Sequence, residues 1–348
     1  MKRAVVAGLV MALALSSNAV LAGHGGDHGG TTVIAGSCPP PPRPVMALDF
    51  DSRYTDDSEN RTEVDPEAAE AMEDALTPVD DLIASLAQDA EKLFDPDSDK
   101  RAVANCIVGR LAIWARAGAL ANLDSETSRL TIGSRYAGLA LVMMQAEEHS
   151  DNYGDITLVR RWLKERMYEQ MTFWEQGPSG ARTGNLRAWA ALAGSTISLL
   201  TNDPVIRGWS AWSVNYILCT ANEDGSLPQE MSRGRLALHY QLHAVAPLVV
   251  STLLLERQGI ALRRVCRNAL DRTVQFSIDD LADGAMSEAI TGEPQSLFED
   301  GSPIDGFRIA WLEAYLRLNN SREIDALAEQ FRPLSFSKLG GNQTLLWN

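Results

Sequence analysis

Basic residues are scarce in this chain. Its 31 lysines and arginines stand against 46 aspartates and glutamates, which leaves a formal net charge of −15 over 348 residues. Binding to nucleic acid depends on basic side chains that neutralise phosphates, so this balance argues against a nucleic-acid partner. An acidic chain can still bind an acidic ligand where its cations converge, because the field in a cleft depends on nearby charges.

Long apolar runs are also lacking, apart from one at the N-terminus. This run extends from Ala4 to Leu15, follows Lys2 and Arg3, and precedes the small-residue site Val20-Leu21-Ala22. The pattern is typical of a secretory signal peptide (residues 1–22), which we expect to be cleaved after Ala22. No other segment approaches the roughly 20 apolar residues of a membrane span. We therefore expect a periplasmic or secreted protein without a membrane span.

Cysteines are few, at positions 38, 106, 219 and 266. An even number in an oxidising compartment permits two disulfides, and four cysteines allow three pairings. We favour Cys38–Cys106, which would tie the proline-rich N-terminal segment to the folded body. For the remaining two cysteines, a disulfide and two buried thiols both stay open.

The alternation of polar and apolar residues that marks strands is absent, and residues 23–45 show no apolar periodicity at all. Residues 23–30 read GHGGDHGG, and four prolines follow Cys38. Residues 23–45 are therefore predicted to be a flexible or extended segment. His24 and His28 form a weak metal-binding pattern, for which a disordered tail is the simpler interpretation.

From about Thr77 the chain is a succession of helical patterns separated by turn signals such as Gly177-Pro178. After two early segments they cover about 129–148, 156–175, 186–201, 206–221, 231–258, 260–282 and 304–318. About a dozen helices joined by short loops favour antiparallel hairpins. Around a common axis such hairpins form an (α/α) toroid with an open central groove. No linker interrupts the series, so residues 46–348 are predicted to be one all-α domain.

The stretch from Gly225 to His243 contains a tyrosine suited to proton transfer. On a helix, residues seven apart differ by only about 20°, so Arg233, Tyr240 and His243 are expected to share a face, with Arg235 and His239 further round. A nearby arginine favours the phenolate, which lets a tyrosine take and return a proton. The alternative is a packed tyrosine with a hydrogen-bonded hydroxyl, flanked by surface arginines.

Two histidines in the same stretch could hold zinc from one helix, because His239 and His243 are four residues apart. The carboxylate that accompanies such a pair in zinc proteases is missing at the required spacing. We therefore expect no metal.

A second cluster opens the helix predicted from about residue 186. It contains Arg182, Asn185, Arg187 and Trp189, with the asparagine and the tryptophan one turn apart. An amide beside arginines suits a sugar carboxylate, and an indole suits the face of a sugar ring. The alternative is an asparagine that caps the helix and a tryptophan that packs in the core.

These clusters stand in a longer collinear series. The other parts of that series are Gly36-Ser37-Cys38-Pro39, Leu48-Asp49-Phe50-Asp51-Ser52-Arg53-Tyr54, Cys106, Trp114-Ala115-Arg116-Ala117-Gly118-Ala119-Leu120, Pro247-Leu248, Trp311-Leu312-Glu313 and Leu339-Gly340-Gly341. In this order they resemble the alginate lyases of polysaccharide lyase family 5, over nearly the whole mature chain.

The resemblance implies an (α/α) toroid that cleaves a 4-linked uronate by β-elimination, without a cofactor. Tyr240 falls on the family's catalytic tyrosine, Arg233 on its arginine and Asn185 on its carboxylate-binding asparagine. Arg53 falls on a lysine of its cleft. We take Arg53, together with Arg182, Arg187, Trp189 and Arg235, as the candidate substrate-binding residues.

One departure from the family concerns its catalytic histidine, because this chain has Leu186 at that position. Leucine neither accepts a proton nor eases the charge of a carboxylate. Arg187, His239 and His243 are close enough in sequence to compensate. In mannuronate and glucuronate the C5 proton and O4 lie on the same side, so one tyrosine can serve as base and then acid. We therefore expect a preference for these uronates over guluronate.

Two other functions stay open. A toroid glycoside hydrolase would use two carboxylates, for which Asp224 and Glu230 are the nearest candidates. A non-catalytic polysaccharide-binding or export-associated protein would have lost the chemistry at Leu186. In each case the expected binding partner is an acidic polysaccharide or oligosaccharide. A polysaccharide secretion complex is a further expected partner. The expected oligomeric state is a monomer.

Overall fold

The computed structural model describes residues 38–55, 57–58, 60–299, 301 and 303–348. The signal-peptide prediction, His24, His28 and the first part of the 23–45 segment lie outside these residues. The helices are α1 Pro66–Glu91, α2 Lys100–Ala117, α3 Glu126–Thr131, α4 Gly133–Glu147, α5 Tyr153–Gln176, α6 Asn185–Thr201, α7 Pro204–Leu218, α8 Pro228–Met231, α9 Ala237–Arg257, α10 Val265–Asp279, α11 Ala285–Thr291, α12 Leu312–Leu318, α13 Arg322–Glu329 and α14 Gln343–Leu346. Short 3-10 helices are η1 Lys92–Phe94, η2 Ala181–Thr183, η3 Gly234–Leu236, η4 Ser296–Phe298, η5 Gly306–Ile309 and η6 Ser337–Leu339.

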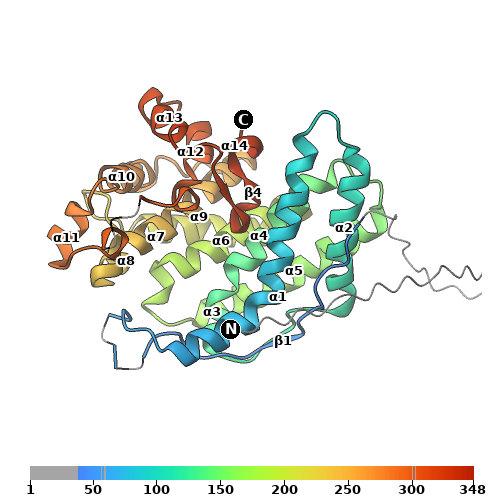
Figure 1. The fold of residues 1–348 in the computed structure, drawn as a ribbon, viewed down its shortest axis with the longest axis horizontal. Helices are drawn as coiled ribbons and strands as arrows, with labels where there is room; N and C mark the ends of the chain where they lie inside the picture. The colour runs from blue at the N-terminus through green and yellow to red at the C-terminus, as the bar shows by residue number, and fades with distance from the viewer. Residues whose placement is uncertain (1–37, 56, 59, 300, 302) are drawn as a thin grey trace, which may run out of the picture. The chain divides into compact units, whose positions relative to one another are not determined.

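The described residues form four short strands of two residues each, which lie outside the helices (Figure 1). They are β1 Ala47–Leu48, β2 Asn122–Leu123, β3 Ser335–Phe336 and β4 Gly341–Asn342, with β1 parallel to β2 and β3 antiparallel to β4. The prediction of an all-α protein is confirmed for the described residues.

One predicted helix is wrong in its extent. The segment predicted at 231–258 consists of α8, the short η3 and then α9, which begins only at Ala237. Gly234 lies between them with a positive φ of 54°, a conformation that favours glycine, and it breaks the helix there. Arg233 therefore lies outside α9, and the shared helical face expected for Arg233 and Tyr240 does not exist.

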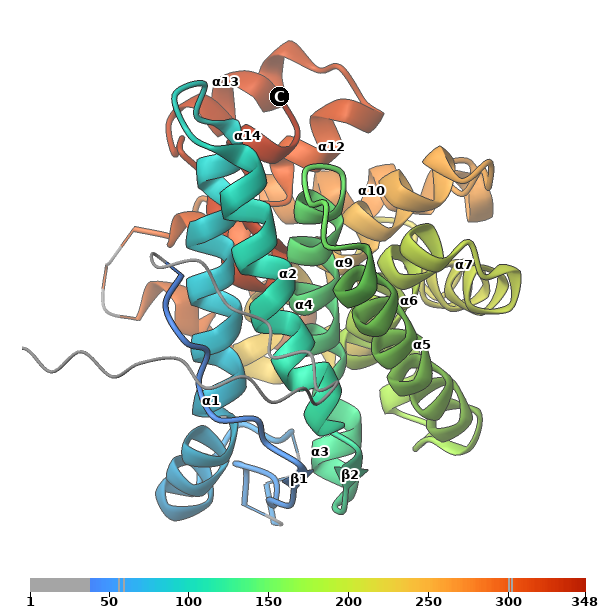
Figure 2. The ribbon, with the colours of Figure 1, turned by 90° about the vertical axis from the view of Figure 1, so that its right-hand side faces the viewer.

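Helix α6 is central because its sequence leaves it no polar face. Small residues run along it, and nearly all of its side chains are buried, including Ala188, Ala190, Ala191, Ala193 and Gly194. A helix that is apolar all round is buried all round. Accordingly α6 packs between α4 and α9 and also against α7 (Figure 1), while α2, α4 and α5 lie side by side on another flank (Figure 2).

The contact between α4 and α6 gives a stability prediction. A Cβ at Gly133 would lie 2.7 Å from the backbone nitrogen of Ala190, whereas a Cβ at Gly154 in α5 would meet no atom within 4 Å. We expect Gly133→Ala to cost about 1–3 kcal/mol, because backbone must move. Gly154→Ala, the matched control, should leave stability equal or slightly higher. Thermal unfolding checks both; equal melting temperatures would contradict the close helix contact.

Helix α9 corrects the expectation that no segment beyond the N-terminus is apolar enough for a membrane. By length and composition, Gly234–Arg257 could cross one. In the structure 89% of its most apolar window is buried. Its apolar residues pack against α6, α10 and α12, which is the behaviour of a core helix.

Both disulfides are present. Cys38–Cys106 ties the N-terminal segment to α2, as predicted, and Cys219–Cys266 shows that the alternative of two free thiols was wrong. The indole nitrogen of Trp114 in α2 also donates to the Pro42 carbonyl at 3.0 Å. Together with the β1–β2 pairing, these contacts fix the path of the chain that leads to Arg53.

Candidate active site

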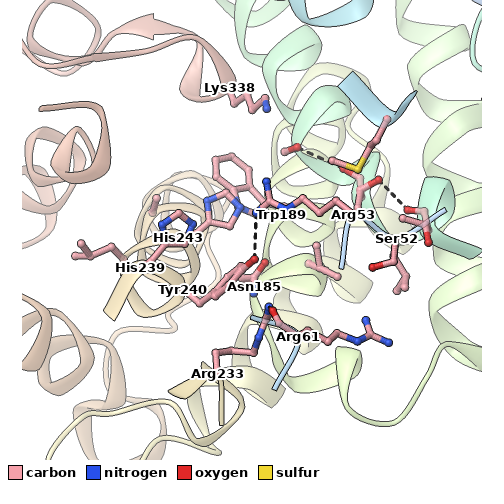
Figure 3. Close-up of a pocket in the computed structure, with 18 of the residues that line it drawn as sticks. Ser52, Arg53, Arg61, Asn185, Trp189, Arg233, His239, Tyr240, His243 and Lys338 are labelled. Atoms are coloured by element: carbon pink, nitrogen blue, oxygen red, sulfur yellow. Dashed lines mark hydrogen bonds between the residues drawn. The ribbon is translucent and has the colours of Figure 1, made fainter. Parts of the chain in front are cut away.

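One cavity of about 480 Å³ gathers most of the sequence-predicted residues. Its walls come from the loop before α1, from α3 and α4, from the first turns of α6 and α9, and from the segments around η5 and β3 (Figure 3). The lining residues are Ser52, Arg53, Tyr54, Arg61, Met72, Glu126, Thr127, Leu130, Thr131, Ser134, Arg135, Asn185, Leu186, Trp189, Arg233, His239, Tyr240, Leu242, His243, Ala246, Phe307, Arg308, Phe336 and Lys338.

The charge of this lining is opposite to that of the chain. Among the residues that the structure describes, its basic members are Arg53, Arg61, Arg135, Arg233, Arg308 and Lys338, and its one carboxylate is that of Glu126. Partial enclosure weakens screening by solvent, so these cations act together on whatever enters. The cavity therefore favours an anionic ligand in spite of the net charge of −15.

Two tyrosine hydroxyls meet in the cavity. Tyr54 lies in the loop before α1 and Tyr240 in the first turn of α9, and their hydroxyl groups share a very short hydrogen bond. The Arg53 guanidinium donates to both, at 2.8 Å to Tyr54 and 3.3 Å to Tyr240 (Figure 3). Arg233 covers the Tyr240 ring, with its guanidinium carbon 3.9 Å from the ring centroid.

This geometry lets the pair lose one proton readily and hold the other. Burial opposes ionisation of Tyr54, but its hydrogen bond to Tyr240 and the charge of Arg53 outweigh burial and lower the pKa of Tyr54. Burial raises the pKa of Tyr240, which also faces Tyr54, although Arg233 counteracts this. One phenolate shared between the two oxygens is thus stabilised by Arg53, and a second is not.

Arg233 also closes the loop over this pair. Its Nε donates to the Asn60 carbonyl at 2.9 Å, and its Nη2 donates to the Arg61 carbonyl at 2.5 Å. These bonds hold the segment that follows Tyr54 against the start of α9. Arg233 therefore has both an electrostatic and a positioning contact with the tyrosine pair.

Asn185 occupies the first position of α6, one residue inside the cap, and is 6% exposed. Its backbone N–H donates to Oε1 of Glu230 at 2.7 Å and its Nδ2 donates to Oε2 at 2.9 Å. Its Oδ1 is buried and has no hydrogen-bond partner among the described residues. The same is true of the Trp189 indole nitrogen one turn later. Both residues line the cavity, so two unpaired polar atoms are buried in its wall on adjacent turns.

Leu186 also lines the cavity, and two of the three candidate replacements for a histidine there, His239 and His243, are uncharged. Burial and the nearby Arg308, whose Nη1 lies 2.9 Å from Nδ1 of His239, lower the pKa of His239 to about 4. Burial and His239 lower the pKa of His243 well below its usual range. His243 packs against Trp189 with the two rings tilted and their centroids 5.2 Å apart. Both imidazoles are neutral near neutrality, so neither brings positive charge to a carboxylate.

The far side of the cavity holds a cationic cluster on a carboxylate. Arg135 binds Asp80 with two bonds of 2.9 and 2.7 Å, and the Lys338 ammonium lies 3.7 Å from the same carboxylate. Burial and the charge of Arg135 lower the pKa of Lys338 to about 8. One carboxylate serves two cations, which leaves this side with a net positive charge at neutral pH.

Three predicted substrate-binding arginines do not line the cavity. Arg187 is 1% exposed and points away from the cavity. Its Nε donates to the Ser213 hydroxyl at 3.1 Å. Its guanidinium lies among four aromatic rings, those of Trp174, Trp209, Trp212 and Tyr216. Arg182 donates to the Gly177 carbonyl at 2.5 Å. Arg235 pairs with Glu299 at 2.7 Å. Successive residues on a helix turn by 100°, so Asn185 and Arg187 face opposite sides.

The carboxylates considered for hydrolysis are not placed for it. Glu230 is buried behind Asn185, and Asp224 accepts hydrogen bonds from the backbone and hydroxyl of Ser226 at 2.9 and 2.7 Å. Neither lines the cavity, so no pair flanks a bound sugar there. Among the described residues no group of three or more histidines, cysteines and carboxylates could hold a metal ion.

Several cavity residues escaped sequence reasoning. Tyr54 follows Arg53 directly and could have been read as part of the same motif. Arg135, Arg308 and Lys338 stand alone in unremarkable sequence, so no local signal marks them. Glu230 is predicted from the sequence only as a candidate acid for hydrolysis. Its position behind Asn185, three residues before Arg233, comes from the structure.

Comparisons with known proteins match most of the chain. The family described as "Alginate lyase" matches residues 114–286. An alginate lyase of Pseudomonas paraeruginosa (strain DSM 24068 / PA7) is 25% identical over 90% of this chain and 86% of its own length. A polysaccharide lyase of Stenotrophomonas maltophilia (strain K279a) is 26% identical over 89% of this chain and 90% of its own.

Solved structures share the fold and confirm the predicted (α/α) toroid. A tyrosine-to-phenylalanine variant of alginate lyase A1-III complexed with a tetrasaccharide has a TM-score of 0.76 at 24% identity, covering 90% of this chain and 86% of its own. The crystal structure of alginate lyase A1-III from Sphingomonas species A1 has a TM-score of 0.73 at 23% identity, covering 90% and 87%. Fold, site and relatives together define a polysaccharide lyase. More particularly, the chain is an alginate lyase-like polysaccharide lyase.

Proposed function

We propose that this chain is a periplasmic or secreted lyase that cleaves a 4-linked, mannuronate- or glucuronate-like acidic polysaccharide by β-elimination. The observation that carries the proposal is the tyrosine pair held by Arg53 and Arg233 inside a cationic cavity. Relatives support the substrate class, because alginate lyase A1-III is described in complex with a tetrasaccharide. The N-terminal signal pattern supports export, and we propose that the chain acts as a monomer.

The reaction needs three tasks. The charge of the C5 carboxylate must be eased so that the neighbouring proton becomes acidic, that proton must be removed, and the departing O4 must be protonated. The cavity cations and the amide of Asn185 serve the first task. For the second task, Arg53 favours the singly ionised pair, and the lower pKa of Tyr54 places the charge mainly on Tyr54. Transfer of the shared proton from Tyr240 to Tyr54 then makes Tyr240 the base.

The third task falls to the same residue. When the C5 proton and O4 lie on one side of the sugar, the protonated Tyr240 is already next to the leaving oxygen and returns the proton. Tyr54, hydrogen-bonded to Tyr240, stabilises the phenolate before the C5 proton is removed and again after O4 has been protonated. A histidine at position 186 is not required for this same-side elimination, whereas guluronate, with the groups on opposite sides, needs a second proton carrier.

Polymer specificity tests the proposal directly. Mannuronate- or glucuronate-containing polymers should yield unsaturated uronate, seen as rising ultraviolet absorbance, and polyguluronate should not. A rise with polyguluronate alone contradicts the single-tyrosine mechanism. New reducing ends without unsaturated product would indicate a hydrolase, and tight binding without cleavage of any polymer would indicate a binding protein.

A further inference from the structure

Glu230 lies behind the wall of the cavity, 1% exposed, and uses both carboxylate oxygens on Asn185. Close approach is possible because residue 184 is glycine: a Cβ there would lie 3.0 Å from Oε1 of Glu230. Helix α6 has no capping side chain of its own, so Glu230 also satisfies an amide at its N-terminus. Neither role explains why the side-chain amide is bound as well.

The bound amide has a fixed direction. An ionised carboxylate accepts hydrogen bonds and donates none, so it must face Nδ2 of Asn185. Oδ1 then remains as the unpaired atom at the cavity wall. An oxygen there accepts from a hydroxyl but repels an ionised uronate carboxylate. A protonated Glu230 can instead donate to Oδ1, which turns the amide over and presents Nδ2 to the cavity as a donor.

We propose that Glu230 is the positioning residue that decides, by its own protonation, whether Asn185 offers the uronate a donor or an acceptor. The inference rests on the proposed function, because it takes a uronate as the ligand of this cavity. It predicts that carboxylate binding is coupled to proton uptake at a residue that does not touch the ligand.

The surroundings of Glu230 allow this protonation near neutral pH. Burial raises its pKa to about 7, although the hydrogen bonds from Asn185 and the charge of Arg233 oppose the rise. Among the described residues, the charged side chain that affects the pKa of Glu230 is Arg233. Helix α6 affects this pKa only through the hydrogen bonds from Asn185. Of the other cavity groups, His239 has a pKa of about 4, and Lys338 has a pKa of about 8 and begins to lose its charge at the upper end of this range. The Glu230→Gln variant described next keeps Lys338 and so separates the two contributions.

The sign of the effect follows from linkage. The ligand carboxylate prefers the donor face of Asn185 and hence protonated Glu230, so binding raises the pKa of Glu230 further. Affinity is therefore full below about pH 6 and falls as pH rises through 7, by at most about tenfold per pH unit. The uronate carboxyl groups stay ionised across this range.

Calorimetry with a mannuronate tetrasaccharide tests the inference in a Tyr240→Phe background, where the ligand should not be cleaved. Between about pH 5.5 and 7.5 we expect affinity to fall by up to about fourfold, the most that a single group with a free pKa of about 7 allows over this range. Glu230→Gln, whose amide is a permanent donor to Oδ1, should keep the low-pH affinity throughout. Glu299→Gln, at the surface pair with Arg235, should retain the fall.

Three outcomes overturn the inference: a flat pH dependence in the background protein, an unchanged pH dependence after Glu230→Gln, or no binding at any pH. If Glu230→Gln does not fold, Asn185→Ala replaces it, since it removes the amide and should leave weak, flat binding. Failure of the proposed function is a separate result. It appears as no unsaturated product from the unsubstituted chain, whatever the binding curves show.

Discussion

Replacing Tyr240 by phenylalanine should lower kcat on a mannuronate polymer by about 10²–10⁴-fold, the usual contribution of a positioned acid–base group. Affinity for oligosaccharide should change little, because the ring and its contact with Arg233 remain. A loss confined to kcat is the mark of an interaction used in the transition state. Initial rates of unsaturated product, with calorimetric binding, provide the measurement.

Two further tyrosines make this experiment selective. Tyr54→Phe removes the neighbour that stabilises the phenolate but leaves Tyr240 in place, so the rise of activity with pH should move to higher pH, and kcat should fall less. Tyr153→Phe, 74% exposed on α5, should have no effect. Equal rates for Tyr240→Phe and the unsubstituted chain would remove Tyr240 from the chemistry.

Arg53→Met should reduce activity at neutral pH by about tenfold to a hundredfold. Arg53 donates to both hydroxyls, at 2.8 and 3.3 Å, and a hydrogen bond to a charged group contributes about 1.5–3 kcal/mol. Without this cation the pKa of the tyrosine pair rises, so the phenolate forms at higher pH. Activity should therefore recover in part as pH increases, which a pH–rate profile measures.

Arg53→Lys is the matched control. It keeps a positive charge beside the pair, and the family resemblance described for the sequence implies a lysine at this place, so most of the activity should return. An Arg53→Met profile reduced equally at every pH would show that Arg53 only binds substrate. Loss of activity in both variants with normal melting temperatures would mean that the two-pronged guanidinium contact is essential.

Much of the fold could be predicted from the sequence because its signals are local. The apolar periodicity of α5 and α6 and the breaks at Gly177-Pro178 and Asn202-Asp203 fix where helices begin and end, independently of what packs on them. The break at Gly234 was missed, because a glycine within an apolar helical pattern is compatible with either a helix or a stop. Because of that error Arg233 was expected on the face of α9, whereas it lies before the helix and contacts the Tyr240 ring from there.

The sequence by itself determined the helical class and one of the two disulfides. It also identified Tyr240, Arg233 and Asn185 as candidate residues of one site. Export remains a prediction. Only the tertiary structure decided that Tyr54 meets Tyr240, that Lys338 and Arg135 face the same cavity, that Arg187 turns away and that Glu230 holds Asn185. Contacts between residues far apart in the chain depend on helix packing and on side-chain direction, for which a sequence has no local signal.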